Sequence, residues 1–488
     1  MKLVIAEKPS VAQSLARVIG ATKRQDGYLE GNGYLVSWCV GHLVELSAPE
    51  RYDERFAKWR LEDLPILPER FLYEVSTGTS KQYQILKGLM ERPDVESLVC
   101  ATDAGREGEL IFRLVYNQCR CKKNFERLWI SSMEDAAIRE GFEKLKPGNA
   151  YDALYEAALC RERADWIVGM NATRLFSCLY GQTLAVGRVM TPTLAMVVMR
   201  DAQIAAFKPE SFWTVQITVG GITASSPRFQ KKEVADDLAA LCREEGQVMI
   251  RTVETKEKLE KPPLLYDLTS LQRDVNRILG FKAQQTLDYT QSLYEKKLVT
   301  YPRTDSRYLT DDMREMLSAL IASVAGKFGY AGEALRTDPV RSASVFDSSK
   351  VSDHHAIIPT KTMAGSDLAG LSSGEKAVLQ LISARLLCAV AEDHRYTEMT
   401  VILSSGSEEF TKKGKTVLVP GWKAIWQHFY PEKKKDEDAS GPVPAEGTLV
   451  KVDAAEVKEG RTSPPKHFTE VICSLRGTWT VPKERSSA

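Results

Sequence analysis

Two stretches of β-type alternation, separated by a long helical block, constrain the fold of this chain most strongly. The first covers residues 213–253, and the second includes residues 399–403 and 417–420. Between them, apolar residues from 268 to about 390 recur at helical spacing, and Lys261-Pro262-Pro263 marks the boundary. We therefore predict one β region that is built from two distant parts of the chain and carries an inserted helical domain.

The N-terminal part of the chain follows the order of an α/β sheet. We predict strands at residues 2–6, 34–40 and 97–101, and the first of them leads into a helix near Ser10. The third strand runs directly into an acidic turn and then into an amphipathic helix. Ligands of α/β sheets gather at the carboxyl ends of the strands, so we expect functional residues to follow these strands.

Composition bounds the class of protein without deciding its function. A chain of 488 residues exceeds one ordinary hydrophobic core, so we predict roughly three or four domains. The formal net charge is +1, which neither supports nor excludes a nucleic-acid partner. Any such affinity must come from a local basic surface.

The sequence gives no sign of a membrane or an oxidising compartment. No apolar run approaches the roughly 18 residues of a transmembrane helix, and the first run is too short for a signal peptide. Of nine cysteines only Cys119 and Cys121 are close together, and no second pair completes a zinc site. We expect a cytoplasmic protein with reduced thiols and no membrane contact.

An acidic cluster predicts a magnesium site. Asp103 and Glu107 follow the third predicted strand, and carboxylate oxygens are the ligands that Mg²⁺ prefers. Glu7 ends a different predicted strand and could join them or serve as a general acid. The alternative is that Asp103 and Glu109 only favour the first turn of a helix.

Tyr301 is the candidate nucleophile. A phenol is a poor nucleophile at neutral pH and needs a cation and a metal nearby. Pro302 biases Tyr301 toward an extended conformation, and Arg303 would offer two hydrogen bonds to a phosphate beside it. Taken alone, without the acidic cluster, this segment is better explained as a half-buried tyrosine that ends a strand or a helix.

Two histidines and a basic stretch are further candidates. His354 and His355 have no evident third metal ligand, so a hydrogen-bonding or phosphate-contacting role is the better prediction, with a structural role for His355 as the alternative. The mainly helical residues 136–203 interleave basic and aromatic side chains, which suits a single-stranded nucleic-acid groove or, for any one of them, a solvated helix face. These residues are Arg161, Arg163, Trp166, Arg174, Tyr180 and Arg188.

Together these segments resemble a type IA DNA topoisomerase, most closely the bacterial topoisomerase III branch with its mobile-element forms. The resemblance runs from Met1 to about Glu470. Several independent motifs in family order are much harder to obtain by chance than one. The motifs lie at residues 4–9, 106–109, 187–193, 300–305 and 354–360.

The resemblance implies a multidomain α/β, α and β fold arranged as a toroid. It comprises a toprim domain (1–140), a helical DNA-groove domain (141–208) and a discontinuous β arm (209–260 and 396–465). An inserted domain (261–395) carries the tyrosine, and an atypical tail (466–488) follows.

The resemblance also implies the chemistry. Tyr301 would attack one DNA strand to form a 5′-phosphotyrosine linkage, and Glu7 would protonate the leaving 3′ oxygen. The other strand would pass before religation, with Mg²⁺ but without ATP, relaxing negative supercoils or decatenating DNA. The implied catalytic residues are Tyr301, Glu7, Lys8, Arg303 and His354, and the implied metal ligands are Glu7, Asp103 and Glu107.

The implied partner is single-stranded or negatively supercoiled DNA, bound by a monomeric protein. No protein partner is indicated. The resemblance places DNA contacts at His42, Trp59, Arg163, Asn171, Arg174, Val186, Gly187, Arg188, Val189, Met190 and His355.

The sequence departs from the family pattern in three places. Gly105 stands where a second aspartate is usual, and Met190 stands where glutamine is common. After Glu470 the family normally continues for another hundred or more residues, so we expect a truncated groove domain. The alternative function is therefore a remnant that binds single-stranded DNA or cleaves it without strand passage.

Overall fold

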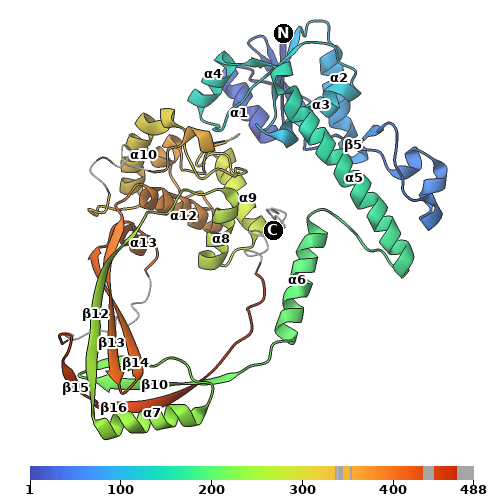
Figure 1. The fold of residues 1–488 in the computed structure, drawn as a ribbon. Coiled ribbons are helices and arrows are strands. Elements are labelled where there is room, and N and C mark those ends of the chain that lie inside the picture. The colour runs from blue at the N-terminus through green and yellow to red at the C-terminus, as the bar shows by residue number, and fades with distance from the viewer. Residues whose placement is uncertain (336–337, 339–343, 352–353, 432–443, 470–488) are drawn as a thin grey trace, which may run out of the picture.

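Four groups of elements form a ring in the computed structural model (Figure 1). An N-terminal α/β domain lies at the top of this view and an inserted helical domain lies beside it. A long β arm closes the bottom, and helices α5 and α6 form the remaining side. The structure describes residues 1–488 except 336–337, 339–343, 352–353, 432–443 and 470–488.

The N-terminal domain is built on a seven-stranded sheet in the order β2-β3-β4-β1-β7-β8-β9. Its centre is parallel: β1 (Lys2–Ala6) pairs with β4 (Tyr34–Trp38) on one side and with β7 (Ser97–Ala101) on the other. Leu3, Val4 and Ile5 are fully buried, as expected for a strand that is covered on both faces. The other strands are β2 (Lys23–Gln25), β3 (Tyr28–Gly31), β8 (Phe125–Arg127) and β9 (Lys146–Pro147).

Helices cover this sheet and connect its parallel strands. Pro9 begins α1, where its missing N–H costs no hydrogen bond, and Gly20 ends the helix in a left-handed conformation. A separate two-stranded sheet of β5 (Val44–Leu46) and β6 (Tyr73–Val75) lies at the edge. The helices are α1 (Pro9–Ile19), α2 (Ser80–Glu91), α3 (Arg106–Gln118) and α4 (Asp135–Glu143).

The β arm confirms that two distant parts of the chain form one sheet. Strands β12 (Gln247–Glu260) and β13 (His394–Ser405) pair antiparallel along almost their whole length, although the entire inserted domain separates them in sequence. The strand order is β15-β12-β13-β14-β11-β10-β16. The remaining strands are β10 (Ser211–Val219), β11 (Ile222–Ser225), β14 (Glu408–Val419), β15 (Leu449–Lys451) and β16 (Ala454–Arg461).

Two helices differ from the sequence predictions. Helix α7 (Lys232–Glu245) lies within the stretch predicted to alternate as β, and it packs an apolar face on the arm. Helix α13 (Trp422–Phe429) falls in the range assigned to the β arm, but its Ile425 and Phe429 are buried in the core of the inserted domain. In both cases apolar residues at helical spacing find a core to bury against.

The inserted domain and the N-terminal domain share one buried apolar cluster. It includes Ala6 and Val11 from the N-terminal domain and Leu293 and Tyr301 from the inserted domain. The shared cluster holds the tyrosine-bearing segment against the first strand of the N-terminal sheet. The helices of the inserted domain are α8 (Leu268–Leu279), α9 (Ala283–Glu295), α10 (Arg314–Lys327), α11 (Lys361–Gly365), α12 (Ser373–Ala389) and α13.

Helices α5 (Asp152–Tyr180) and α6 (Met190–Ala205) connect the N-terminal domain to the arm. Few of their side chains are fully buried, and α6 has none. No helix in the described residues is long and apolar enough to cross a membrane.

Candidate active site

Tyr301 of the inserted domain lies against the carboxyl ends of the N-terminal strands. Its hydroxyl donates a hydrogen bond to Oδ2 of Asp103, 3.1 Å away, and its ring is only 7% exposed. Its backbone N–H donates to the carbonyl of Ser131 at 3.2 Å. The extended segment that holds it is anchored because the Thr300 N–H donates to the carbonyl of Ile358. The candidate nucleophile is thus buried between two domains.

Two carboxylates meet beside the phenol. The backbone N–H of Asp103 donates to Oε2 of Glu7 at 3.2 Å. Burial, and then the charge of Asp103, raise the pKa of Glu7 to about 7, and burial also raises the pKa of Asp103. Burial and both carboxylates raise the pKa of Tyr301. Glu7 can therefore hold a proton near neutral pH, as a general acid requires.

Lys8 and Arg303 supply the positive charge of the site. Both lower the pKa of Glu7 and of Asp103. The Lys8 ammonium lies 3.6 Å from a carboxylate oxygen of Glu295 and is partly exposed. The Arg303 side chain is exposed. The structure therefore places both predicted cations close enough to influence the carboxylates electrostatically.

His354 is fixed as a neutral ring beside the tyrosine. Its Nε2 contacts the carbonyl of Ala104, and its Nδ1 lies 2.9 Å from the hydroxyl oxygen of Ser131. Because a carbonyl only accepts, Nε2 carries the proton and Nδ1 accepts from Ser131. Burial lowers the pKa of His354 to about 4. Its ring centroid lies 4.3 Å from that of Tyr301, with the planes tilted by 37°.

Arg127 supports the acidic turn, and the sequence carried no signal for it. Its fully buried guanidinium donates to the carbonyls of Asp103 at 2.7 Å and of Thr102 at 2.8 Å. Its Nε donates to Oε2 of Glu109 at 3.0 Å, and the other oxygen of Glu109 accepts from Arg113 at 2.9 Å. Glu109 lies in the first turn of α3, as the alternative reading expects, and it is also a buried ion-pair partner.

The two glycines of the turn differ in what they permit. A Cβ at Gly108 would lie 2.0 Å from the carbonyl oxygen of Asp103, so only glycine fits there. A Cβ at Gly105 would have no atom within 4 Å, and the backbone there is extended. The aspartate that is usual in the family at position 105 would therefore fit without a clash.

The structure brings two of the three predicted metal ligands together. Glu7 and Asp103 are adjacent, whereas Glu107 lies apart, with its Oε2 3.6 Å from Nε2 of His42. Among the described residues no group of three metal-ligating side chains is assembled, so the predicted three-carboxylate set is not formed. Two hard oxygen donors still fit Mg²⁺, which commonly keeps several waters and takes only one or two carboxylates.

Comparison with known proteins places this geometry in a family. Residues 149–472 match the DNA topoisomerase family, and residues 2–133 match the Toprim domain family. The chain belongs to the DNA topoisomerase family. It is 41% identical over 479 residues to DNA topoisomerase 3 of Bacillus subtilis and 41% identical over 480 residues to that of Bacillus licheniformis. These matches identify a type IA, topoisomerase III-like chain.

The similarity covers most of this chain but less of its relatives. Both matches span 96% of this chain and 66% of the Bacillus protein. The structure of full-length topoisomerase I from Thermotoga maritima superposes with a TM-score of 0.72 at 23% identity, covering 97% of this chain and 74% of that one. That likeness supports the multidomain toroidal fold.

Two residues of this topoisomerase-family chain that we predicted to contact DNA, Asn171 and Arg174, form hydrogen bonds with the protein's own backbone instead. Oδ1 of Asn171 accepts the backbone N–H of Ile66 at 2.6 Å. Arg174 is 5% exposed and donates to the carbonyl of Phe56 at 2.7 Å, with its guanidinium over the ring of Trp59. Burial therefore contradicts the prediction that Arg174 contacts DNA, whereas Trp59 is 44% exposed and accessible.

Other predicted contacts are engaged with neighbours but reachable from solvent. Arg188 holds both carboxylate oxygens of Asp165, at 2.7 and 3.1 Å, on the surface. Arg163 lies over the ring of Phe71 at 4.9 Å. His42 faces Glu107, and the hydrogen bond to that carboxylate raises the pKa of His42.

The loop before α6 presents apolar side chains. The Val186 N–H donates to the hydroxyl of Thr173 at 2.9 Å, and the Gly187 N–H donates to the hydroxyl of Thr191 at 3.0 Å. Val189 and Met190 follow and are 63% and 56% exposed. These exposed side chains next to Arg188 are apolar, so they offer no hydrogen-bonding group to a base.

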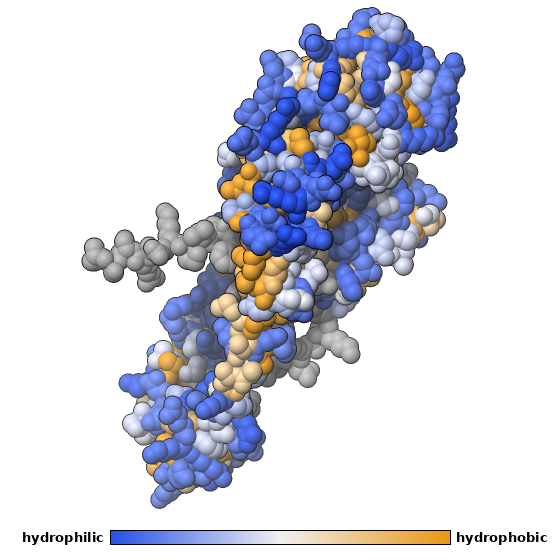
Figure 2. Space-filling view, turned by 90° about the vertical axis from the view of Figure 1, so that its right-hand side faces the viewer, coloured by the Kyte–Doolittle hydropathy of each residue, from blue (hydrophilic) through white to orange (hydrophobic). Residues whose placement is uncertain are grey.

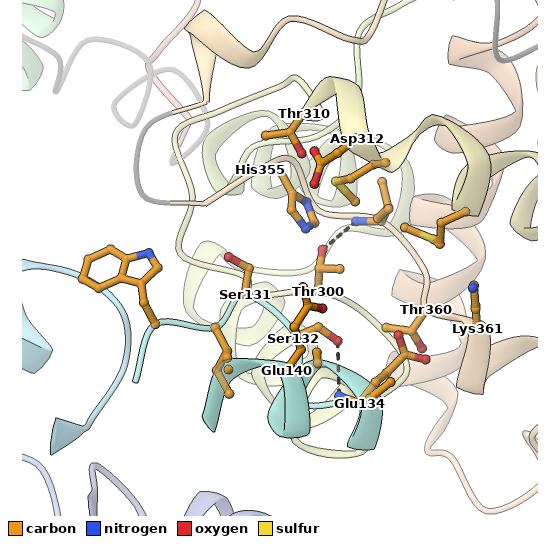
Figure 3. Close-up of a pocket in the computed structure, with 18 of the residues that line it drawn as sticks. Ser131, Ser132, Glu134, Glu140, Thr300, Thr310, Asp312, His355, Thr360 and Lys361 are labelled. Carbon is orange, nitrogen blue, oxygen red and sulfur yellow. Dashed lines mark hydrogen bonds between the residues drawn. The ribbon is translucent and has the colours of Figure 1, made fainter. Parts of the chain in front are cut away.

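His355 lines a cavity of about 600 Å³ between the two domains, and Tyr301 is not among the residues that line it (Figure 3). Its Nδ1 lies 2.8 Å from the carbonyl of Ala356, and burial lowers its pKa. Ser131 and Glu134 of the N-terminal domain also line this cavity. The two neighbouring histidines thus have different surroundings: His354 packs against Tyr301, whereas His355 faces the cavity.

Proposed function

We propose that this chain is an Mg²⁺-dependent, ATP-independent DNA topoisomerase that cleaves one strand through Tyr301, passes another and reseals the break. One observation carries the proposal. The hydroxyl of Tyr301, from one domain, is hydrogen-bonded to Asp103 of the other, next to Glu7. A buried phenol beside paired carboxylates and two cations suits phosphodiester attack better than it suits a structural tyrosine.

The cleavage step uses groups already in contact. The phenol oxygen of Tyr301 attacks the phosphorus while its proton passes to Asp103, the present acceptor. The bond from phosphorus to the 3′ oxygen breaks, and Glu7 gives its proton to that oxygen. Religation is the reverse: the 3′ hydroxyl displaces the tyrosine and each proton returns. The ester conserves the bond energy, so the cycle needs no ATP.

Charge on the phosphate requires cationic groups. Lys8 and Arg303 stabilise the negative charge that develops on the non-bridging oxygens. Asp103 would hold Mg²⁺, with Glu7 able to join it once that carboxyl has given up its proton, and the bound ion would supply Lewis-acid stabilisation of the same charge. Neutral His354 packs against the Tyr301 ring and keeps that side of the phenol dry.

The arrangement in the structure is a closed state. Tyr301 is almost fully buried, so DNA reaches it only when the inserted domain separates from the N-terminal domain. The same separation would admit the passing strand into the ring. We propose single-stranded or negatively supercoiled DNA as the substrate of a monomer that acts on bacterial DNA in the cytoplasm.

Relaxation of negatively supercoiled plasmid with Mg²⁺ tests the proposal. Tyr301→Phe removes only the nucleophilic oxygen, so we expect relaxation and the covalent protein–DNA adduct to fall below detection. Tyr308→Phe is the matched control, because Tyr308 lies on the same segment outside the carboxylate pair, and it should relax plasmid like the wild type. A Tyr301→Phe protein that still relaxes plasmid would overturn the assignment.

The same assay separates the alternative function. The chain spans 66% of its Bacillus relatives, so strand passage is tested apart from cleavage. A wild-type protein that forms the adduct on a single-stranded oligonucleotide but leaves plasmid supercoiled would be a cleavage-only enzyme. Binding without an adduct would reduce it to a single-stranded DNA-binding protein.

A further inference from the structure

Ser131 touches both the nucleophile and its neighbouring histidine. Its carbonyl accepts the backbone N–H of Tyr301 at 3.2 Å, and its hydroxyl lies 2.9 Å from Nδ1 of His354. No other described residue makes hydrogen bonds to both of these groups. Ser131 belongs to the N-terminal domain, whereas Tyr301 and His354 belong to the inserted domain.

The hydroxyl of Ser131 supplies the hydrogen bond that holds the Nδ1 side of the His354 ring, while the carbonyl of Ala104 sets the tautomer. The carbonyl of Ala104 at Nε2 needs a proton on that nitrogen, which leaves Nδ1 as a pure acceptor. His354 is 3% exposed, so water does not readily replace a lost donor. The ring in turn lies 4.3 Å from the ring of Tyr301 and forms one wall of the phenol site.

The segment that follows Ser131 is fixed to the inserted domain. Oε1 of Glu134 accepts both the N–H and the hydroxyl of Thr362 at 3.0 Å. The Lys297 ammonium forms an ion pair with Asp135. These contacts lie outside the carboxylate pair, yet they hold Ser131 at a set position relative to Tyr301.

We propose that Ser131 is a positioning residue for strand cleavage: its hydroxyl holds the His354 ring in one orientation and its carbonyl holds the Tyr301 backbone when the two domains close. The proposal rests on the proposed function for its catalytic part. Ser131 itself touches neither the phosphate nor the reacting oxygen. Its effect reaches the phenol through His354.

Three variants of the full chain test this role. Ser131→Ala removes the hydroxyl and keeps the carbonyl, Ser131→Thr restores a hydroxyl, and Ser132→Ala is the control. The Ser132 hydroxyl accepts the N–H of Glu134 at 3.2 Å and contacts neither Tyr301 nor His354. Adduct formation on a single-stranded oligonucleotide is measured in a single turnover at saturating DNA, together with the affinity for that oligonucleotide.

We expect Ser131→Ala to slow adduct formation about three- to tenfold, the effect of one neutral hydrogen bond, with unchanged DNA affinity. Ser131→Thr should recover most of the rate, and Ser132→Ala should match the wild type. Equal loss in Ser132→Ala, or no loss in Ser131→Ala, would overturn the proposal. A weaker DNA affinity at an unchanged rate would also overturn it.

A spectroscopic readout separates this proposal from the proposed function. Protein labelled with ¹⁵N-histidine, with His354→Gln to assign the signals, reports the tautomer of His354 and the hydrogen bonding of its Nδ1. Both proteins should show the Nε2-protonated form, and the Nδ1 signal of Ser131→Ala should move to the position of a nitrogen that accepts no hydrogen bond. If the wild type forms no adduct, the topoisomerase proposal fails while this measurement still decides the positioning of His354. An unchanged Nδ1 signal in Ser131→Ala would refute the positioning role.

Discussion

The two sides of the ring differ in how their functional residues are held. Where the N-terminal and inserted domains meet, Tyr301 and His354 are 7% and 3% exposed, and each makes hydrogen bonds across the boundary. On the opposite side, Leu194 and Met199 of α6 are 63% and 65% exposed. The cleavage residues are therefore organised by burial, whereas the helices predicted to guide DNA present uncovered apolar side chains.

The uncovered face is continuous. Figure 2 shows hydrophobic residues gathered along the narrow middle of the molecule, on the side that α6 forms. A contiguous apolar surface of this kind is unusual on a soluble protein. Residues near the end of the described chain contact α6. Arg200 of this helix donates to the carbonyl of Lys466 at 2.6 Å and lies over the ring of Phe468.

The largest expected effect is on the buried side. Arg127→Met removes the guanidinium that holds Glu109 and two carbonyls of the acidic turn. Because Glu109 would remain buried with less compensation, we expect the free energy of unfolding to fall by about 3–5 kcal/mol. Urea denaturation followed by circular dichroism measures the loss, and plasmid relaxation should fall with it.

An exposed ion pair provides the control for that variant. Lys144 and Glu140 form a pair whose side chains are 72% and 62% exposed. Lys144→Met should leave the free energy of unfolding almost unchanged, since exposed pairs contribute little. Similar losses of stability for both variants would mean that burial does not determine how much the Arg127 ion pair contributes to the free energy of unfolding.

A matched pair of leucines compares the two sides directly. Leu387 of α12 is fully buried and Leu194 of α6 is 63% exposed. Leu387→Ala should lower the free energy of unfolding by about 2–5 kcal/mol, and Leu194→Ala by less than about 0.5 kcal/mol. Thermal and urea denaturation of both proteins check this. A loss above 1 kcal/mol for Leu194→Ala would show that something covers α6 in solution.

The elements with strong periodicity were predictable, and the exceptions have physical reasons. The strand at 97–101 appears as β7 with the same bounds, because a buried parallel strand is a continuous apolar run. Helix α7 was missed although Ala235, Leu238, Ala239 and Cys242 recur at helical spacing, because β alternation flanks it on both sides. The charged run at residues 432–442 ends in Gly441-Pro442 and predicts a solvated loop. Most of it and most of the predicted tail lie outside the described residues.

The site was predictable only in its reactive groups. The side chains of Tyr301, Asp103 and Glu7 can act as nucleophile, metal ligand or acid, so the sequence marks them as candidates. The structure brings them together. Arg127 and Ser131 act through contacts that form only in three dimensions, so no local pattern marks them. Gly105, the expected site of a further carboxylate, has open space around it, so only its chemistry departs from the family.

The smallest expected effect is a pH dependence at the buried side. The pKa of Glu7 is raised from 4.5 to about 7, so between these values the folded protein binds more protons than the unfolded chain. Stability from this group is fully present below pH 4.5 and is lost as pH rises toward 7, by on the order of 1–3 kcal/mol. Glu7→Gln keeps the neutral shape and should flatten that part of the stability curve.

Denaturation midpoints between pH 4.5 and 8 measure this pH dependence, with Glu96→Gln, whose side chain is 86% exposed, as the control. If Glu7→Gln keeps the wild-type slope, the protonated carboxyl belongs elsewhere in the site, and Asp103, whose pKa burial also raises, becomes the proton carrier.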